Sequence, residues 1–345
     1  MVCMSTARKV LIAVAGVLGA LILVAVAAAF VYGPTMTAKF SGTARFWGTD
    51  TPRRYAKTVL DLSEEGIYGD SEEFRAARAA AEDAVQGASS RDDVRSALND
   101  AVKAAGGKHS KLIEPGAEQD NASEADTRSP SVNVKDGVAR ATVPGVGRHD
   151  DGQHYADTLA KGLAAARDGG ACGAVVDLRG NDGGDMGPML AGVSPLLPDG
   201  TALEFVSNAY SSPVTIEGNG VRGGGSPTTT SGGKWDAPVA VLVDGDTASS
   251  AEATMLAFRG LDHAKSFGTP TAGYASANMV YDFPDGSALM LTIAKDKART
   301  GEVFSEDPIS PMSPAAKTQP SRGSRPSTAA HKTRKSSALC DGAEL

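Results

Sequence analysis

The sequence predicts an α/β fold in which helices cover a sheet, and three observations lead to this prediction. Two continuous apolar runs, residues 173–178 and 238–243, have the length and composition of buried central strands. Residues 155–167 place apolar side chains on one face of a helix. Strand, turn and helix patterns alternate through this half of the chain, as they do in α/β domains. With aromatic residues at only 5%, the core must be built from Val, Leu and Ala.

An uncharged stretch near the N-terminus predicts a membrane span. Residues 10–32 carry no charge and can cross about 30 Å of hydrocarbon as a helix. Arg8 and Lys9 precede the stretch, so residues 1–9 are expected in the cytoplasm and the rest of the chain outside. A cleaved signal peptide with secretion is the alternative, since residues 25–29 offer small-residue cleavage sites. A retained anchor is favoured because signal h-regions are shorter.

Residues 50–107 are expected to form a small helical bundle. Pro52 suits the first turn of a helix, and Asp70 with Glu73 has the spacing of a capping box. After Ser90, apolar side chains recur at the spacing of one helical face until Gly106 and Gly107 end the pattern.

Two hairpins and a tail complete the predicted organisation. Alternating residues surround Asp136-Gly137 and Asp285-Gly286, both of which are hairpin turn signals. Residues 313–345 are rich in Ser, Pro, Ala, Lys and Arg and are expected to be a disordered basic tail. The expected parts are therefore a cytoplasmic N-terminus (1–9), an anchor (10–32), a helical bundle (50–107), an α/β core (108–312) and this tail.

Charge and cysteine content exclude several classes of protein. The formal net charge is −7, which argues against nucleic-acid binding because neutralising phosphates requires a basic surface. Residues 313–345 hold six basic and two acidic residues, so that segment carries +4 and the remainder −11. Three cysteines (Cys3, Cys172 and Cys340) are too few for a disulfide framework, and none is expected to do chemistry.

Two motifs resemble cofactor or metal sites and are interpreted as loops. The spacing of Gly218, Gly220 and Gly223 matches a dinucleotide fingerprint, but it follows no predicted strand and opens no predicted helix. His149 and His154 flank two aspartates in a Gly-containing turn before a helix, where a solvated turn is the better interpretation. No cofactor and no metal is therefore expected.

The stretch "VLVDGDTASSAEATMLAFRG", residues 241–260, places two serines where a strand is followed by a helix. One interpretation is capping, because a Ser or Thr hydroxyl at that position accepts a hydrogen bond from a backbone N–H. The other is a nucleophile on a sharp turn, with helix-terminal N–H groups receiving a developing oxyanion.

Two further features favour the nucleophile. The stretch "VVDLRGNDGGDM", residues 175–186, also has a strand followed by a polar turn, and Gly183-Gly184 allows backbone N–H groups to approach a ligand closely. A nucleophilic serine needs a base, and His109 in "GGKHSKL" is the best placed of the five histidines. Asp182 and Asp185 flank the glycines, and carboxylates there would repel an oxyanion.

These motifs resemble the tail-specific, or C-terminal-processing, serine peptidases. The similarity covers roughly residues 50–309 through "DLRGNDGG", "DGDTASSAE", "FGTPTAGYASAN" and "DGSALMLT". The pair "KHS" and "TASSAE" is specific to the nisin-resistance branch of that family. The resemblance implies an N-terminal helical bundle and a crotonase-like (ClpP/crotonase) α/β peptidase core. Only residues 110–130 separate His109 from the first hairpin, so the PDZ domain of many relatives is expected to be absent.

The resemblance also implies roles for individual residues. Ser249 matches the nucleophile, Ser250 would lend its backbone N–H to an oxyanion hole, and Gly183 with Gly184 would supply the second donor. Glu252 matches a glutamate that supports the site. Many members carry a lysine base where this chain has Tyr274, which is a poor base because the pKa of tyrosine is near 10.

His109 matches the histidine base of the nisin-resistance branch. The expected function is therefore a membrane-anchored extracytoplasmic serine endopeptidase that uses a Ser249–His109 dyad without a cofactor. Its expected partners are peptides or unfolded proteins, which include cationic antimicrobial (lantibiotic-like) peptides and protein C-termini. The alternative is a peptide-binding protein on the same fold that does not hydrolyse its ligand.

Overall fold

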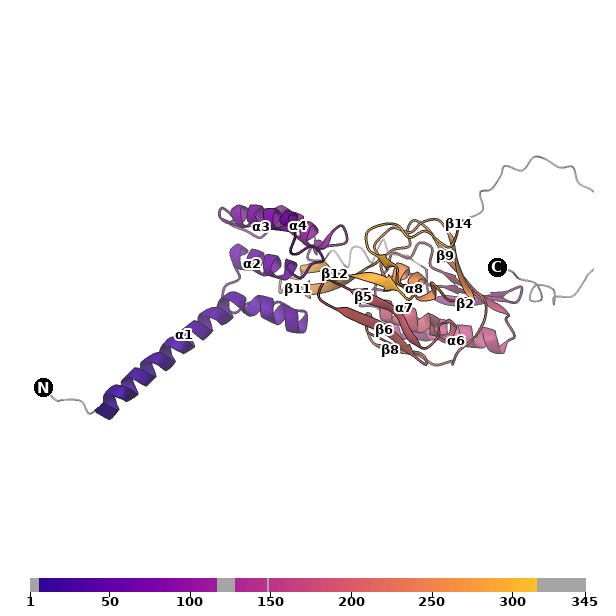
Figure 1. Cartoon of the computed structure of the whole chain (residues 1–345), viewed down its shortest axis with the longest axis horizontal. Helices are drawn as coiled ribbons and strands as arrows, with labels where there is room; N and C mark the ends of the chain where they lie inside the picture. Colours follow the sequence, from indigo (N-terminus) through magenta and orange to yellow (C-terminus); the bar gives the residue numbers. More distant parts are fainter. Residues whose placement is uncertain (1–5, 117–127, 148, 315–345) are drawn as a thin grey trace, which may run out of the picture. The chain divides into compact units, whose positions relative to one another are not determined.

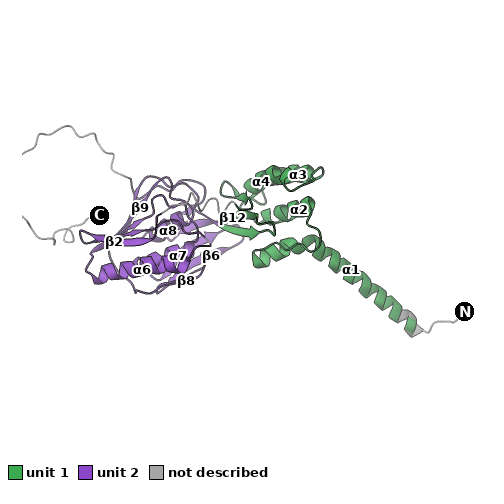
Figure 2. Ribbon diagram, turned by 180° about the vertical axis from the view of Figure 1, so that it is seen from behind, with its two compact units in different colours: residues 1–120, 278–293 green, residues 121–277, 294–345 purple. Residues whose placement is uncertain are grey.

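The computed structural model describes residues 6–116, 128–147 and 149–314, and the chain divides into two compact units. Unit 1 comprises residues 1–120 and 278–293, and unit 2 comprises residues 121–277 and 294–345 (Figure 2). Each unit has its own hydrophobic core of buried side chains.

Unit 1 begins with one long helix, α1 (Thr6–Ser41). Its residues 11–41 are long and apolar enough to cross a membrane. Pro34 lies inside the helix and cannot donate to the carbonyl of Phe30 four residues earlier. Arg54 fills this gap, since its Nη2 donates to Phe30 O at 2.7 Å and its guanidinium lies over the Phe30 ring. Figure 1 shows α1 bending in its last third, as expected near an internal proline.

The predicted helical bundle is confirmed as α2 (Pro52–Ser63), α3 (Glu72–Val85) and α4 (Asp92–Gly106). Pro52 stands at the first turn of α2 behind the N-cap Thr51. The predicted cap of α3 is wrong by one residue: Ser71, not Asp70, accepts the Phe74 N–H, at 3.0 Å. Ser71 has an extended backbone directly before the helix. Its hydroxyl lies three residues before the Phe74 N–H, which is the usual spacing of an N-cap.

Strands from two distant parts of the sequence complete unit 1. β1 (Lys111–Ile113) pairs antiparallel with the first part of β12 (Ala288–Ala298), and β11 (Ser276–Asp282) also pairs with β12. The predicted hairpin at Asp285-Gly286 therefore joins β11 to β12. Buried side chains of these strands, such as Tyr281 and Leu291, pack with those of the three helices.

The main sheet of unit 2 has the order β14-β10-β9-β4-β3-β2. Its strands are β2 (Ser131–Lys135), β3 (Val138–Thr142), β4 (Gly173–Asp177), β9 (Val239–Val243), β10 (Ala264–Gly268) and β14 (Ser313–Pro314). The neighbours from β3 to β14 are parallel, and only the β2–β3 hairpin is antiparallel. The two apolar runs are thus the central strands β4 and β9, as predicted.

Three helices and a second sheet surround this sheet in unit 2. The helices are α6 (Gly152–Asp168), α7 (Met186–Val193) and α8 (Ser250–Phe258), with a 3-10 turn at Ser194–Leu196. The second sheet contains β5 (Gly200–Val206), β6 (Ser211–Glu217), β7 (Gly220–Arg222), β8 (Thr228–Thr229), the last part of β12, and β13 (Val303–Phe304). Helix α8 contacts β9 and β10 on one side and β5 on the other, which explains why Ala251–Phe258 are all buried (Figure 1).

Several smaller predictions can be compared with this structure. Gly218 lies in the turn between β6 and β7, and Gly220 is the first residue of β7. The dinucleotide-like motif thus opens no helix, as predicted, but it follows a strand and is only partly a loop, because residues 211–222 form a hairpin. Ser313 and Pro314 pair with β10, so the predicted tail begins within the sheet, and the rest of it lies outside the described residues. Cys172 is disulfide-bonded, contrary to the expectation that no cysteine reacts. Among the described residues no PDZ domain is evident between β1 and β2.

Candidate active site

Two turns at the carboxyl edge of the main sheet carry most of the predicted site residues. β4 and β9 are parallel neighbours, so the turns that follow them emerge at the same edge. In α/β sheets this edge is where ligands bind. The turn after β4 leads to α7 and contains Gly183 and Gly184, and the turn after β9 leads to α8 and contains Ser249.

Ser249 has a strained backbone. Its φ is 54° and its ψ is −120°, at the N-cap of α8. Asp136 (φ 52°) is the other non-glycine residue with positive φ in the described chain, and it lies in the β2–β3 hairpin turn, where such values are common. For serine this conformation costs about 1–3 kcal/mol, and such strain concentrates at functional sites. A nucleophile on a sharp strand-to-helix turn has this geometry.

Glu252 holds the strained turn. Its Oε2 accepts the Ser249 N–H at 2.9 Å and the Tyr274 N–H at 2.6 Å, while its Oε1 accepts the Gly273 N–H at 3.0 Å and the Thr271 hydroxyl. The carboxyl is completely buried. Burial raises its pKa, and the hydrogen bonds from Thr271, Tyr274, Gly273 and Ser249 act against that rise. Four donors fit an ionised carboxylate, which fastens the serine to the 271–274 loop.

The two turns are fastened to each other. Ser250 Oγ donates to Gly184 O at 2.6 Å, and Ala248 N donates to Asn181 O at 2.9 Å. A Cβ placed on Gly183 would lie 2.8 Å from the Ser249 Cβ, so only glycine fits there. Gly183 and Gly184 also have φ of 111° and 112°, which side chains rarely adopt. The glycines therefore let the first turn pack directly against the serine.

The backbone N–H groups near Ser249 differ in whether they are already used. Gly183 N donates to Asn181 Oδ1 at 2.8 Å. Within the described residues no protein acceptor takes the N–H of Gly184 or of Ser250. Gly184 is also exposed to solvent. Of the two predicted glycines, Gly184 is therefore the one whose N–H remains available to an oxyanion.

Asp244, which was not among the predicted site residues, braces both turns together with Thr247. Asp244 Oδ1 accepts the N–H groups of Gly180 at 3.0 Å and of Thr247 at 3.1 Å. Thr247 Oγ1 donates to Leu178 O at 3.0 Å and accepts the Asp244 N–H at 3.0 Å. An Asp directly after a strand and followed by Gly is a turn signal that could have suggested this role.

The two aspartates beside the glycines have different surroundings. Asp185 is the N-cap of α7, and its Oδ1 accepts the N–H groups of Gly187 at 3.1 Å and Ser226 at 2.8 Å. These two N–H donors offset part of the charge of Asp185 beside the glycine turn. Asp182 is exposed and follows Asn181 at the start of the glycine turn. It is the remaining acidic group beside the proposed oxyanion site.

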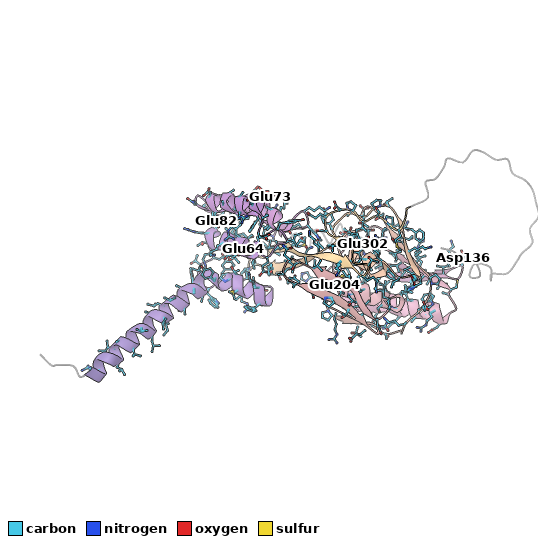
Figure 3. All side chains as sticks on the ribbon, viewed as in Figure 1. Glu64, Glu73, Glu82, Asp136, Glu204 and Glu302 are labelled. Carbon is cyan, nitrogen blue, oxygen red and sulfur yellow. The ribbon has the colours of Figure 1, made fainter. Side chains whose placement is uncertain are left out.

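Acidic side chains elsewhere are spread over the surface, and many form ion pairs. Figure 3 labels Glu64 and Glu82, which both pair with Arg78, at 2.7 and 2.9 Å. It also labels Glu204, which pairs with Lys297 at 3.4 Å, and Glu302, which pairs with Arg259 at 2.8 Å. These ion pairs lie within one unit or the other and offset part of the negative charge that the sequence analysis counted.

A second buried carboxyl lies near Glu252. Asp296 on β12 is 1% exposed, and its Oδ1 has no hydrogen-bond partner among the described residues. Burial and the nearby charge of Glu252 raise its pKa well above the usual value. Since Glu252 has four donors and Asp296 Oδ1 has none, Asp296 carries the proton of this pair.

His109 lies in unit 1, on the turn between α4 and β1. Gly107 (φ 78°) reverses the chain there, which explains the glycine pair before the histidine. The ring is partly buried, and the Asn278 Nδ2 lies 3.1 Å from its Nδ1 and 3.0 Å from its Nε2. Burial, together with Lys111 and Lys108, lowers the pKa of His109 to about 4. Its imidazole is therefore neutral at physiological pH.

Among the described residues, the other histidines and acids form no cluster that could hold a metal ion. No group of three or more His, Cys, Asp or Glu side chains in the described residues could hold a metal ion. The predicted solvated turn before α6 is confirmed: Asp151 is the N-cap and accepts the His154 N–H at 2.9 Å. The arrangement around Ser249 thus offers a hydroxyl, backbone N–H donors and a buried carboxylate.

Known proteins are similar to this chain in sequence. Residues 145–312 match the family described as Peptidase family S41. The nisin-resistance protein of Lactococcus lactis subsp. lactis is 35% identical over 289 residues, which are 79% of this chain and 89% of that protein. The carboxy-terminal processing protease CtpA of Bacillus subtilis (strain 168) is 29% identical over 162 residues, 46% of this chain and 32% of that protein.

A solved structure is also similar to this chain. A lipoprotein from Streptococcus agalactiae is similar with a TM-score of 0.68 and 26% identity, over 78% of this chain and 93% of that one. The predicted α/β peptidase fold and the resemblance to tail-specific peptidases are thereby confirmed. This chain belongs to peptidase family S41 and is a serine peptidase.

Proposed function

We propose that this serine peptidase is a membrane-anchored extracytoplasmic endopeptidase whose nucleophile is Ser249 and whose general base is His109. The observation that carries the proposal is the strained Ser249, fixed by Glu252 beside the unused N–H groups of Gly184 and Ser250. A hydroxyl on a strained turn next to free N–H donors has the parts that acyl transfer requires.

The proposed reaction has two stages, acylation of Ser249 and hydrolysis of the acyl-enzyme. Ser249 Oγ attacks the carbonyl carbon of the scissile peptide bond while its proton moves to His109. The N–H groups of Gly184 and Ser250 receive the oxyanion. The C–N bond then breaks, and the leaving amine takes the proton from His109. Water then attacks the acyl carbon while its proton moves to His109. The ester C–O bond breaks, Ser249 Oγ takes that proton from His109, and the carboxylic acid leaves.

The ionisation of His109 sets the expected pH dependence. A general base must be neutral before it takes a proton. Because the pKa of His109 is lowered to about 4, the neutral form prevails at every pH above that value. Hydrolysis is therefore expected to persist well below pH 6.5, the ordinary pKa of histidine, and to fall as the pH approaches 4.

A fluorophosphonate probe tests the dyad directly, because it labels only an activated serine. Wild type and Ser250→Ala are expected to label, since alanine keeps the backbone N–H, while Ser249→Ala is expected not to. His109→Ala is expected to label far more slowly, and Tyr274→Phe at nearly the wild-type rate. Labelling of Ser249→Ala would overturn the assignment of the nucleophile. A Tyr274→Phe variant as unreactive as His109→Ala would overturn the assignment of the base.

The end of α1 is fixed in unit 1, at the point where the apolar span ends. The last turns of the helix are buried in unit 1, through Gly33, Pro34, Thr35 and Ala38. Lys39 forms an ion pair with Glu65 at 2.7 Å, and Arg54 binds the Phe30 carbonyl. Cleavage at residues 27 or 29 would cut this helix directly before the part that unit 1 holds.

Exposed aromatic side chains support a position at the membrane surface. Tyr32, Met36 and Phe40 follow each other at intervals of four along α1 and are 55%, 48% and 85% exposed, and Trp47 is 57% exposed. Residues at this spacing share one helix face. Aromatic side chains at the end of a membrane helix are typical of the lipid–water interface. Lipid contact would cover this apolar stripe, which continues the apolar helix surface.

Tryptophan fluorescence tests this part of the proposal on the full chain. The chain has two tryptophans, so Trp235→Phe leaves Trp47 as the only reporter. In bilayers with brominated lipids we expect quenching of Trp47. In Trp47→Phe, the buried Trp235 is expected to show none. Unquenched Trp47, or a chain that an alkaline wash removes from the membrane, would contradict the anchor.

Cationic peptides are the proposed substrates. The relative from Lactococcus lactis is named a nisin-resistance protein, and this chain carries −11 outside residues 313–345. An acidic surface attracts cationic ligands, and salt screens this attraction over about 8–10 Å. Matched cationic and neutral peptides are to be compared at low and high salt, in wild type and in Asp182→Asn. A cationic preference that salt and Asp182→Asn both reduce is expected, and equal rates at low salt would contradict it.

A further inference from the structure

Three uncharged side chains lead from the interior of unit 1 to His109. Ser110 and Thr292 are 0% and 1% exposed. Ser110 Oγ accepts the Thr292 N–H at 2.9 Å and donates to Thr292 Oγ1 at 3.2 Å. Thr292 Oγ1 donates to Asn278 Oδ1 at 2.8 Å, and the Asn278 amide nitrogen contacts the His109 ring. The chain of contacts joins the His109–β1 segment to β12 and β11.

The contact with Thr292 decides which way the Asn278 amide faces. Because Oδ1 accepts from the Thr292 hydroxyl, Nδ2 is the atom turned to His109. An amide N–H can donate only to a ring nitrogen that has a lone pair, so this contact suits the neutral imidazole and not the imidazolium. The contact with Asn278 therefore lowers the pKa of His109, as burial, Lys111 and Lys108 do.

The position of Asn278 also restricts how the His109 ring can turn. Its Nδ2 is nearly equidistant from the two ring nitrogens, at 3.1 and 3.0 Å. The amide therefore contacts both ring nitrogens and fixes where the ring lies.

We infer that Asn278 is a positioning residue, held by Thr292 and Ser110, which fixes the His109 imidazole and favours its neutral form. The inference deepens the proposed function and rests on it, since a fixed neutral imidazole matters most if His109 is the base. In the described structure, Lys111 and Lys108 are the charged groups that lower the pKa of His109, while β11 presents the uncharged Asn278 to the ring.

The test combines a ring pKa with kinetics on the full chain. Asn278→Asp puts a carboxylate beside the ring, which favours the imidazolium. We expect the pKa of His109, measured by NMR of the ring, to rise by about 1 unit or more. The acid limb of kcat/KM should rise by the same amount, because the base then stays protonated to a higher pH. Asn278→Leu should lower kcat about tenfold with little change in KM.

Matched variants separate positioning from a general loss of stability. Thr292→Val removes the hydroxyl that orients Asn278 and should lower kcat, whereas Thr292→Ser keeps it and should restore the wild-type rate. Asn99→Leu is the control, because Asn99 Oδ1 accepts the Leu112 N–H at 3.1 Å in the same unit without contacting His109. It should leave both the ring pKa and the acid limb unchanged.

The outcomes distinguish this inference from the proposed dyad. If the pKa of His109 in Asn278→Asp equals that of wild type, Asn278 does not act on the ring and the inference is overturned. If the ring pKa moves and the acid limb of hydrolysis does not, Asn278 positions His109 but His109 is not the base. The second result would overturn the dyad and leave the inference standing.

Discussion

The turns after β4 and β9 meet at one edge of the main sheet, and both contain residues with positive φ. They differ in the type of residue that adopts this backbone conformation. The first uses glycines, Gly183 and Gly184, at φ of 111° and 112°. The second places Ser249 at φ of 54°, although glycine would adopt this conformation without strain. Both turns need a left-handed backbone to change direction sharply. Only one of them carries a side chain where that backbone is strained.

The difference agrees with the proposed role of Ser249 as the nucleophile, because the first turn needs space and the second keeps a side chain. At Gly183 a Cβ would lie 2.8 Å from the Ser249 Cβ, so the first turn gives up its side chain to allow close approach. At Ser249 the hydroxyl is retained, and the hydrogen bond from its N–H to Glu252 holds the strained conformation. Strain that neighbouring contacts maintain is typical of a site whose geometry is functional.

The largest expected effect separates strain from chemistry at Ser249. Ser249→Ala and Ser249→Gly should both lower kcat/KM about 10⁴-fold or more, because neither has a nucleophile. Ser249→Gly should also unfold at a higher temperature than Ser249→Ala, since glycine relieves about 1 kcal/mol or more of strain. Peptide hydrolysis and thermal unfolding measure the two effects. Equal stability of the two variants would show that the turn is not strained.

The second prediction concerns the space at Gly183. Gly183→Ala should abolish fluorophosphonate labelling and destabilise the fold, because its Cβ would meet Ser249. Gly200→Ala is the matched control, since Gly200 has φ of 110° but a Cβ there would meet nothing within 4 Å. The control should lose about 1 kcal/mol of stability from strain alone and keep its labelling. If the two variants label equally, close approach at Gly183 is not required.

The third prediction tests how Glu252 holds the serine turn. Glu252→Gln should lower kcat about 10- to 100-fold, because an amide NH₂ replaces one acceptor oxygen and leaves a backbone donor unpaired. Glu302→Gln, which alters a surface carboxylate of the same unit paired with Arg259, should change activity little. Steady-state kinetics of both variants decide the matter, and a fully active Glu252→Gln would show that the turn holds itself.

The smallest expected effect concerns Asp296, whose buried carboxyl lies near that of Glu252. Its folded pKa lies above its unfolded value, so wild-type stability falls as the pH rises from about 4 toward the folded pKa, by at most about 1.4 kcal/mol per pH unit. Asp296→Asn removes this group and should be more stable than wild type at pH 7 and nearly equal at pH 4. Urea unfolding at both pH values measures the difference, and a pH-independent difference would contradict the buried proton.

Local patterns in the sequence predicted most elements correctly. Strands β4 and β9, helix α6, the three-helix bundle and both hairpins follow from residues adjacent in the chain. The cap of α3 failed by one residue because Asp70 and Ser71 are both good caps, and only the backbone geometry selects between them. Ser249 and the Gly183-Gly184 turn were also visible, because each directly follows an apolar run.

The residues that hold the site residues in place could not be predicted from short segments of the sequence. Asn278 contacts His109 across 169 positions, and the Thr271 hydroxyl contacts Glu252 across 19. Asp296 has no local signal that predicts its burial beside Glu252. Such contacts depend on which strands become neighbours, and the order of strands in a sheet is not written in any short segment.

The sequence by itself determined the peptidase family, the predicted nucleophile and the two turns, because motifs of adjacent residues carry them. Only the tertiary structure decided the φ of Ser249, the use of the Gly183 N–H by Asn181 and the role of Asp185 as a helix cap. The physical reason is that hydrogen-bond donors and buried carboxyls are satisfied by whatever the fold brings near them. The type of a residue determines which groups it can bind, and the packed structure determines which of them lie within reach.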